Sequence, residues 1–340
     1  MLRKIFNRKR PKPKPLDTSR KLAFTILMQE KNELKIASLL PSATEIVCAL
    51  GLEKNLVGIT HECDYPASVT GKPHLTASRI SHETMSSAEI DHAVRSNLDG
   101  HGSIYDLNEK LLAELKPDLI ITQELCEVCA VSYKTVQKAA KMFVADATVV
   151  SLEPNTIADI FDNIKTIGAL TETKDEAQKV VAELQNRLDK IREKTENLKK
   201  RPRVFMLEWL EPPFAPGHWT PEQVEIAGGD CLLGEAGSKS LTTTYKAITE
   251  SKPEILVLIP CGYYTQDTVR QLETTKFPSN WRELPAVKNN RVWAMDASAY
   301  FSRPAPRVVD GAEILAKISH ADVFGEPSEK EAIRVKLNFE

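Results

Sequence analysis

No apolar run in the 340-residue sequence approaches the ~18 residues that a membrane-spanning helix needs. Most of the chain also lacks a basic surplus: 45 Lys and Arg stand against 47 Asp and Glu, and nine of the basic residues fall within residues 1–21. The rest of the chain is therefore acidic, which disfavours binding to a phosphate backbone. We expect a protein that neither spans a membrane nor binds nucleic acid.

Common catalytic motifs are absent as well. The sequence contains no GxGxxG dinucleotide loop, no GxxxxGK[ST] phosphate loop, no G-x-S-x-G nucleophile elbow and no HExxH zinc motif. A chain of this length and composition still predicts two domains, each large enough to bury a core. These observations favour a binding protein over an enzyme.

Residues 1–34 read as a basic tail and lead-in segment. Pro11, Pro13 and Pro15 prevent a helix in the tail. The apolar run Leu22–Met28 is followed by Gln, Glu and Lys, whereas a secretion signal ends at small residues. Six cysteines with one close pair suit a reducing compartment. Together these features favour a cytoplasmic location over an extracytoplasmic one.

Strands and helices alternate along the chain, which predicts α/β structure with parallel sheets. Strands are expected at residues 35–40, 55–60, 118–122, 148–152, 203–208, 255–259 and 291–295, and helices at residues 41–50, 132–142, 156–170, 221–227 and 305–318. Ser42 is expected to cap the first helix, with Glu45 as the partner in a capping box. The polar stretch 78–107 reads as an insertion without an assigned role.

A charged amphipathic segment separates the two halves. Its apolar residues have helical spacing, and Thr173 with Glu176 predicts a capping box at its start. The Lys-Pro pairs at Lys116 and Lys252 precede corresponding strands, which indicates two related lobes. The predicted architecture is two Rossmann-like lobes with parallel sheets joined by a single long bridging helix. The expected parts are an N-terminal lobe (35–172), the bridging helix (173–200), a C-terminal lobe (201–320) and a C-terminal extension (321–340).

Chemically active side chains follow several of the predicted strands. Ligands of open parallel sheets bind beyond the carboxyl ends of the strands, so we expect these side chains to line a cleft between the lobes. The candidate ligand-binding residues are His61, Glu62, Glu124, Phe214, His218, Trp219, Tyr300 and Arg303. The aromatic residues among them either stack on a planar ligand or close the core of a lobe. Arg303 and the nearby Arg307 either pair with an acidic ligand group or bridge the lobes.

The Cys126-x-x-Cys129 pair is the sharpest local motif. Two thiolates at this spacing can hold one metal ion or form a redox pair. His61 and Cys63, at the end of a neighbouring strand, would complete a four-ligand shell for zinc or iron. A disulfide pair and inert thiols remain open as alternatives.

Several motifs together resemble the cobalamin-binding-like branch of the periplasmic binding protein superfamily. The resemblance spans about residues 34–319 and rests on Ile36–Glu45 (IASLLPSATE), Asp64–Pro66, Leu115–Leu119 (LKPDL), Pro212–Phe214, Ala227–Gly229 and Phe301–Arg307 (FSRPAPR). It implies a ligand clamped between two lobes and delivery of cobalamin, haem or siderophores to the permease of an ABC transporter. It also implies that Glu109 docks on that permease. Where cobalamin-carrying relatives have aromatic residues, this chain has Glu62, Arg79 and Glu124, and Phe214 keeps the pattern.

The leading hypothesis is a ligand-binding protein that holds a cobalamin-like or metal-containing small molecule in an interlobe cleft. The alternative is an intracellular metal-binding or redox protein, centred on Cys126 and Cys129, that reuses the binding-protein fold. A third reading is an interaction module that uses the basic tail.

Overall fold

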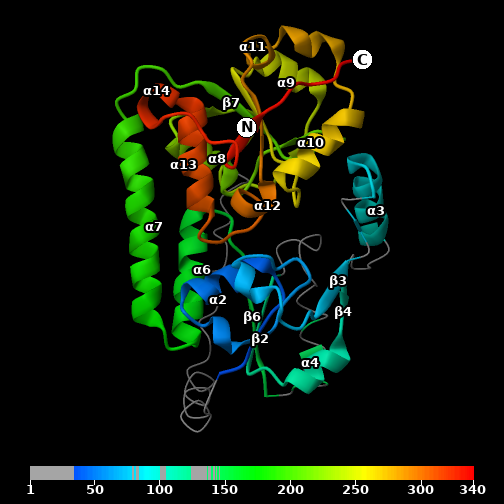
Figure 1. Cartoon of the computed structure of the whole chain (residues 1–340), viewed down its shortest axis with the longest axis vertical. Coiled ribbons are helices and arrows are strands. Elements are labelled where there is room, and N and C mark those ends of the chain that lie inside the picture. Colours follow the sequence, from blue (N-terminus) through cyan, green and yellow to red (C-terminus); the bar gives the residue numbers. More distant parts are fainter. Residues whose placement is uncertain are drawn as a thin grey trace, which may run out of the picture. The chain divides into compact units, whose positions relative to one another are not determined.

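The computed structural model describes residues 34–340 except residues 79, 82–83, 100–104, 124–135, 137–138, 141, 143 and 145. Residues 35–340 make up one unit, and the description below concerns that unit (Figure 1). Among the described residues, no helix is both long and apolar enough to cross a membrane.

The first sheet is wholly parallel, with the strand order β2-β1-β5-β6. Its strands are β1 (Ile36–Ser38), β2 (Leu56–Gly58), β5 (Leu119–Thr122) and β6 (Thr148–Ser151), and its helices include α2 (Pro41–Ala49), α4 (Glu109–Leu115) and α6 (Ile157–Leu170). β1 and β5 are buried throughout. This is expected where a parallel sheet is covered on both faces.

The second sheet has the order β13-β12-β11-β7-β9, in which only β13 runs antiparallel. Its strands are β7 (Arg203–Leu207), β9 (Asp230–Cys231), β11 (Ile255–Leu258), β12 (Val292–Met295) and β13 (Ala332–Arg334). The helices of this lobe are α8 (Thr220–Ile226), α9 (Tyr245–Ser251), α10 (Thr265–Thr274), α11 (Pro285–Lys288), α12 (Ala297–Tyr300), α13 (Val308–Ser319) and α14 (Ala321–Phe324). A short ribbon pairs β8 (Phe214–Ala215) with β10 (Leu241–Thr242).

The two lobes repeat the same corner at the start of their central strands. Lys116 ends α4 and Lys252 ends α9, each in the left-handed conformation with φ 49° and each followed by a proline. The carboxylate of Asp118 then accepts a backbone N–H beside β1 at 3.0 Å, and that of Glu254 accepts the first N–H of β7 at 3.1 Å. The corner that indicated two related lobes therefore recurs in the structure with the same backbone conformation and an equivalent hydrogen bond.

The lobes are joined by α7 (Lys174–Thr195), a helix of 22 residues. It packs along α6 of the first lobe and against α13 and α8 of the second (Figure 1). Gly168 lets the helices approach closely, because a Cβ at this position would lie 2.5 Å from the Cβ of Ala177. At the other lobe, Arg187 binds Asp310 at 2.5 Å and Glu313 at 2.7 Å on α13. The predicted fold class, with its bridging helix, is confirmed.

The predicted capping box at the first helix is wrong. Leu40 is the N-cap residue of α2 and makes no side-chain cap, and Pro41 occupies the first helical turn with Ser42 behind it. Proline suits this position because its fixed φ is helical and it has no N–H to satisfy. The carboxylate of Glu45 does not return to the helix start but binds Arg307 of the other lobe.

The capping box predicted for the bridging helix is also wrong. Thr173 makes no side-chain cap, and its hydroxyl lies 2.8 Å from that of Thr171. A complete capping box instead begins α6, where Thr156 accepts the N–H of Asp159 and the Asp159 carboxylate accepts the N–H of Thr156. A tertiary or local hydroxyl partner can thus replace the cap that a sequence pattern suggests.

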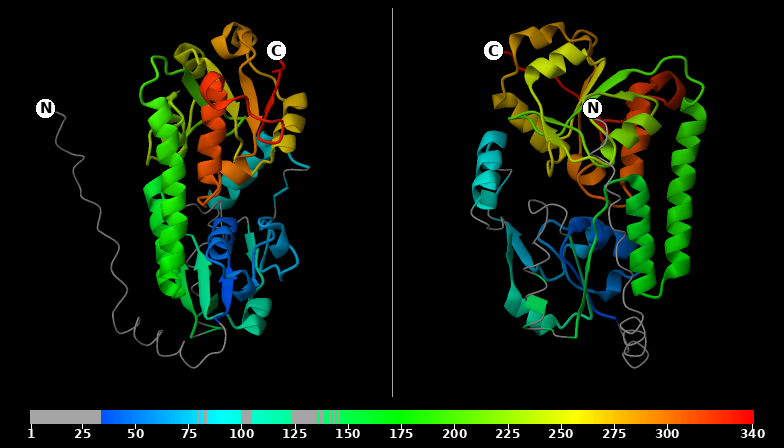
Figure 2. Two further views of the ribbon diagram at one scale, coloured as in Figure 1. Left: turned by 60° about the vertical axis from the view of Figure 1, so that its left-hand side comes forward. Right: turned by 180° about the vertical axis from the view of Figure 1, so that it is seen from behind.

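The polar insertion contains defined structure. β3 (Thr76–Ser78) pairs antiparallel with β4 (Tyr105–Leu107), and α3 (Ser87–Asp99) lies between them in the chain. Figures 1 and 2 show α3 in cyan beyond the end of this ribbon, away from the first sheet.

Candidate functional site

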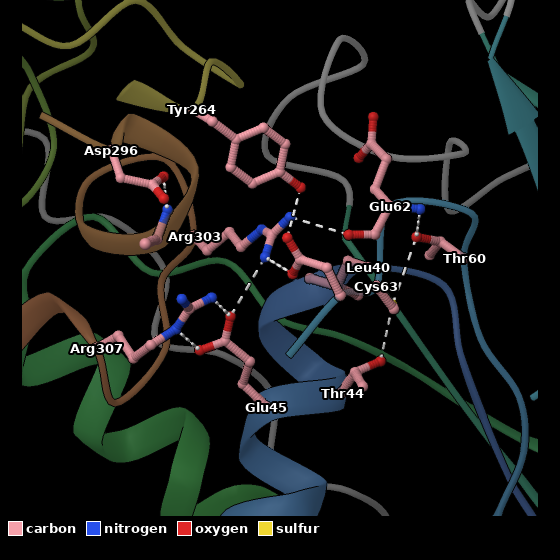
Figure 3. Close-up of polar contacts among 12 residues, drawn as sticks. Leu40, Thr44, Glu45, Thr60, Glu62, Cys63, Tyr264, Asp296, Arg303 and Arg307 are labelled. Carbon is pink, nitrogen blue, oxygen red and sulfur yellow. Dashed lines mark hydrogen bonds and ion pairs between the residues drawn. The ribbon is translucent and has the colours of Figure 1, made fainter. Parts of the chain in front are cut away.

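Loops from the carboxyl ends of both sheets meet in a cluster of charged side chains (Figure 3). The loop after β2 supplies Glu62 and Asp64, the loop after β11 supplies Tyr264, and the segment after α12 supplies Arg303. These loops come together because the two sheets present the same ends to each other. This is the edge at which open α/β sheets bind ligands.

Arg303 is the centre of the cluster. Its guanidinium donates to the carboxylate of Asp64 and, at 2.9 Å, to the backbone carbonyl of Glu62, and it lies 3.6 Å from a carboxylate oxygen of Glu45. Only 9% of its side chain is exposed. Although burial opposes the charged form, the neighbouring carboxylates raise the pKa of Arg303. Arg303 therefore stays charged and joins three groups of the other lobe.

Arg307 forms a second link between the lobes. Its Nε and Nη2 bind the two carboxylate oxygens of Glu45 at 2.9 and 2.5 Å, a bidentate geometry that strengthens an ion pair. The guanidinium also lies over the ring of Tyr65, 4.2 Å from its centroid. The side chain of Glu45 is 2% exposed. Burial raises the pKa of Glu45, and the hydrogen bonds and charge of Arg307 oppose that rise.

Tyr264 completes the cluster. Its hydroxyl donates to Asp64 at 2.5 Å, and burial together with this bond raises the pKa of Tyr264 to about 12. Burial acts to raise the pKa of Asp64, but the charge and hydrogen bond of Arg303 outweigh it and hold that pKa below its ordinary value. Asp64 is therefore ionised at neutral pH, and the cluster holds the two lobes together through charged groups.

His61 lies beside this cluster on the first lobe. Its Nδ1 is 2.8 Å from the hydroxyl of Thr76, and its ring centroid is 5.8 Å from that of Tyr105. Its Nε2 is buried and has no hydrogen-bond partner in the described part of the chain, with a Glu62 oxygen 3.8 Å away. Burial lowers the pKa of His61. The imidazole is thus neutral near pH 7, and its buried Nε2 has no hydrogen-bond partner among the described residues.

Cys63 faces the interior of the first lobe. Its Sγ lies 3.0 Å from the hydroxyl of Thr44 and 3.5 Å from that of Thr60. Burial raises the pKa of this thiol, so it is protonated at neutral pH. Figure 3 shows Cys63 next to Thr44, below the level of Arg303.

His218 occupies the corresponding rim of the second lobe. Its backbone has φ 52°, which is strained for a residue other than glycine, and backbone bonds to Ser238 and Gly237 fix it there. Its Nδ1 is buried without a hydrogen-bond partner among the described residues. Burial, with a smaller contribution from Lys239, lowers the pKa of His218. This imidazole is also neutral near pH 7, and its Nδ1 is buried.

The predicted aromatic residues differ in how much of their surface is available. Trp219 is 5% exposed and donates its Nε1–H to the carbonyl of Phe301 at 2.9 Å. Tyr300 is half-buried, with its ring edge-on to Phe301. Phe214, at the start of β8, is also partly buried. Trp219 therefore contributes mainly to the lobe itself, whereas Tyr300 and Phe214 keep accessible surface.

Three predicted residues, Glu124, Cys126 and Cys129, lie outside the described residues. Within the described part of the chain, no group of three or more His, Cys, Asp or Glu side chains is arranged to hold a metal ion. Glu109 is exposed in the first turn of α4, and Asn108 caps this helix.

A pocket of about 610 Å³ lies elsewhere, among α6, α7 and α8. It is lined by side chains such as Phe161, Arg192 and Glu222, and by none of the predicted ligand-binding residues. Glu222 of the second lobe accepts the N–H of Ile157 at the start of α6, at 2.7 Å. This pocket is separate from the charged cluster.

Sequence reasoning missed three members of the cluster. The sequence pattern places Glu45 in a capping box and Asp64 within a family motif, and it gives Tyr264 no role. Asp64 and Tyr264 each lie in the loop that follows a parallel strand, β2 or β11, which was the available signal. Glu45 needed the knowledge that Arg307, 262 residues away in the chain, lies opposite.

Comparison with known proteins gives a consistent match. A family model described as "Periplasmic binding protein" matches residues 36–299. A vitamin B12-binding protein of Vibrio cholerae is 25% identical over 284 residues, which covers 82% of this chain and 86% of that protein. An uncharacterised ABC transporter substrate-binding lipoprotein of Bacillus subtilis is 25% identical over 305 residues, covering 87% of this chain and 83% of its own length.

Among solved structures, a periplasmic haem-binding protein from Pseudomonas aeruginosa superimposes with a TM-score of 0.65. The sequences are 17% identical, and the match covers 85% of this chain and 93% of that protein. At this identity the likeness concerns the fold.

These matches correct the expected location. The family model describes periplasmic proteins, and the relative from Bacillus subtilis is a lipoprotein, so the predicted cytoplasmic location is wrong and an extracytoplasmic one is indicated. The cysteine count had indicated a reducing compartment. This inference failed because an unpaired thiol can simply be a small side chain packed in the protein, whatever the compartment. The alternative of an intracellular redox protein centred on Cys126 and Cys129 is likewise not favoured.

Proposed function

The chain belongs to the periplasmic binding protein family, and from that premise we propose that it binds a cobalamin-type corrinoid between its lobes and delivers it to an ABC transporter permease. The relative from Vibrio cholerae named as a vitamin B12-binding protein aligns with most of the chain. Haem, the ligand named for the structural relative from Pseudomonas aeruginosa, is the second candidate.

The observation that carries this proposal is the meeting of carboxyl-end loops from both lobes at Arg303 and Asp64. A ligand placed beside this contact is within reach of both sheets at once. Polar groups there, including the Glu62 carboxylate, suit the amide side chains of a corrinoid. Tyr300 and Phe214 supply apolar surface for its ring.

Two imidazole nitrogens suit the metal of such a ligand. His61 Nε2 and His218 Nδ1 are buried, and within the described residues neither has a hydrogen-bond partner. Burial lowers both pKa values, which keeps the rings in the neutral form that binds metals. Imidazole is a common axial ligand of macrocycle-bound metal ions. We assign one of these two nitrogens to the cobalt or iron of the bound ligand.

The test is titration of the purified full chain with hydroxocobalamin and, separately, with haemin. Visible absorbance reports replacement of the water on the metal by imidazole, and calorimetry reports binding itself. His61→Ala and His218→Ala are compared with His92→Ala, whose exposed ring on α3 serves as the control. We expect the wild type and the control to give the same spectral change, and one of the two site variants to lose it.

If calorimetry detects binding to the wild type but its absorbance spectrum does not change, the ligand assignment stands and the axial role of histidine is wrong. Binding of haemin alone would replace the corrinoid with haem. The absence of both heat and spectral change with either compound would reject the proposal.

For delivery, we propose that Glu109 contacts the permease. It is exposed at the start of α4, a position that Tyr245 occupies in α9 of the other lobe. Docking on this chain would therefore rest on a carboxylate from one lobe only. Binding of the permease to Glu109→Lys, compared with Glu114→Lys in the same helix, tests this assignment.

A further inference from the structure

The insertion of the first lobe contacts aromatic residues of the second. Ile90 of α3 is 4% exposed and forms an apolar cluster with Trp209 and Tyr263, which are 9% and 0% exposed. The partly buried Met85 and Val94 of the insertion pack around the same cluster. The Nε1–H of Trp209 donates to the carbonyl of Ser87, the first residue of α3, at 3.2 Å.

These aromatic residues stand where the fold offers a ligand surface. Trp209 follows β7 and Tyr263 follows β11, both at the carboxyl end of the second sheet. The two rings pack edge to face, 5.5 Å apart, and Phe214 packs against the cluster. A planar ligand would use this aromatic wall, defined as Trp209, Phe214 and Tyr263. In the structure α3 already packs on Trp209 and Tyr263, whereas Phe214 stays partly accessible.

The contact is also limited in extent. α3 is presented by the two-stranded β3–β4 ribbon, and Ala88, Glu89, His92 and Arg95 are exposed on the helix. A 13-residue helix is marginal by itself in water, so its stability depends on the apolar face that packs on another element. Because that face is small and lies at the rim, its release requires little disruption of either lobe core.

We propose that α3 is a resident occupant of the aromatic wall, displaced when a ligand binds. Its apolar residues Met85, Ile90 and Val94 shield the wall in the ligand-free protein. A ligand that stacks on the wall must replace these contacts. Only a ligand with enough apolar surface to compensate for their loss can therefore displace α3. This inference rests on the proposed function for the identity of the ligand, and on the α3 contacts for the displacement.

The experiment weakens the α3 contact and measures binding. Ile90→Glu places a charge against Trp209 and Tyr263, and Ala88→Glu adds the same charge to the exposed face as a control. When α3 packs on the wall, only a fraction of the molecules can bind the ligand. The apparent affinity is then the intrinsic affinity multiplied by that fraction. We expect Ile90→Glu to bind hydroxocobalamin about tenfold more tightly than wild type, and Ala88→Glu to bind it like wild type. Ile90→Ala, a milder change, gives a smaller gain and covers the case in which Ile90→Glu fails to fold.

Hydrogen exchange of the full chain gives an independent readout. In the wild type, hydroxocobalamin is expected to speed exchange in residues 84–99 and to slow it in the loops after β2 and β11. Equal or weaker binding by both Ile90 variants, with exchange in α3 unchanged or slowed, would overturn the displacement while leaving the function intact. Binding by the Ile90 variants alone would support it. If neither hydroxocobalamin nor haemin binds to any variant, the proposed function and the displacement both fail.

Discussion

Replacement of Glu45 with glutamine removes the negative charge that joins Arg303 and Arg307 while it keeps the shape of the side chain. Glu45 is 2% and Arg307 16% exposed, and their hydrogen bonds measure 2.5 and 2.9 Å. Loss of one partner from a buried ion pair typically costs about 3–5 kcal/mol, because the other charge stays buried. Arg303 keeps Asp64 as a partner. Burial raises the pKa of Glu45 despite the nearby arginines, so the cost of burying its charge offsets part of the benefit of the pair. We therefore expect a loss no larger than the lower bound, about 3 kcal/mol.

The measurement is urea unfolding at pH 7, followed by circular dichroism. Glu176→Gln is the matched control, because it breaks an ion pair of 2.8 Å whose members are 53% and 71% exposed, and it should cost less than about 0.5 kcal/mol. The double variant Glu45→Leu with Arg307→Met should recover most of the loss, since it leaves neither charge of this pair buried. A loss below about 1 kcal/mol for Glu45→Gln would show that the pair is solvated, and the account of the interlobe cluster would be wrong.

Two further predictions concern the buried carboxylate of Glu208 and the packing of α6 against α7. Burial raises the pKa of Glu208 to about 7. Between the pKa of this group in the unfolded chain and pH 7, the folded protein therefore binds more protons than the unfolded chain does. The free energy of unfolding thus falls as pH rises through this range. Glu208→Gln should remove this slope and gain up to about 3 kcal/mol over wild type at pH 8, but not at pH 4, as measured by unfolding across pH; a parallel decline in both proteins would refute it. Gly168→Ala should destabilise the chain by about 1–3 kcal/mol, because the new methyl group would lie 2.5 Å from Ala177; an unchanged melting temperature would show that α6 and α7 separate freely.

Local patterns were sufficient for the seven strands expected in the two parallel sheets and for five helices, α2, α6, α7, α8 and α13. The shorter helices, the two-stranded ribbons and the edge strands β9 and β13 were not predicted, and the helix expected at residues 132–142 lies largely outside the described residues. β5 and β11 follow Lys-Pro corners, and their uninterrupted apolar residues are what a doubly covered strand requires. The bridging helix was readable from its apolar spacing. The capping box failed at the first helix because Pro41 starts that helix and Glu45 binds Arg307 of the other lobe. It failed at the bridging helix because the Thr173 hydroxyl pairs locally with that of Thr171. A sequence pattern does not show which partner is present.

The site was accessible in part. The carboxyl-end rule placed His61, His218 and Arg303 at the rim. The lack of a hydrogen-bond partner at one nitrogen of each imidazole and the ion pairs of Arg303 depend on burial, which only the fold reveals. Of the two readings for Arg303 and Arg307, the bridge between lobes is the one observed. The contact between Trp209 and Ser87 joins residues 122 positions apart, and no short-range pattern encodes it.

The way α7 is fastened constrains how cargo is exchanged. Near its start it is pressed against α6 at Gly168, and further along Arg187 is fixed to two carboxylates of α13. Because α7 is held by contacts with both lobes, it resists bending, and the lobes are not free to open by a large hinge motion. Under the proposed function, a ligand would enter and leave through small movements at the rim, such as the proposed displacement of α3, without a large change in the angle between the lobes.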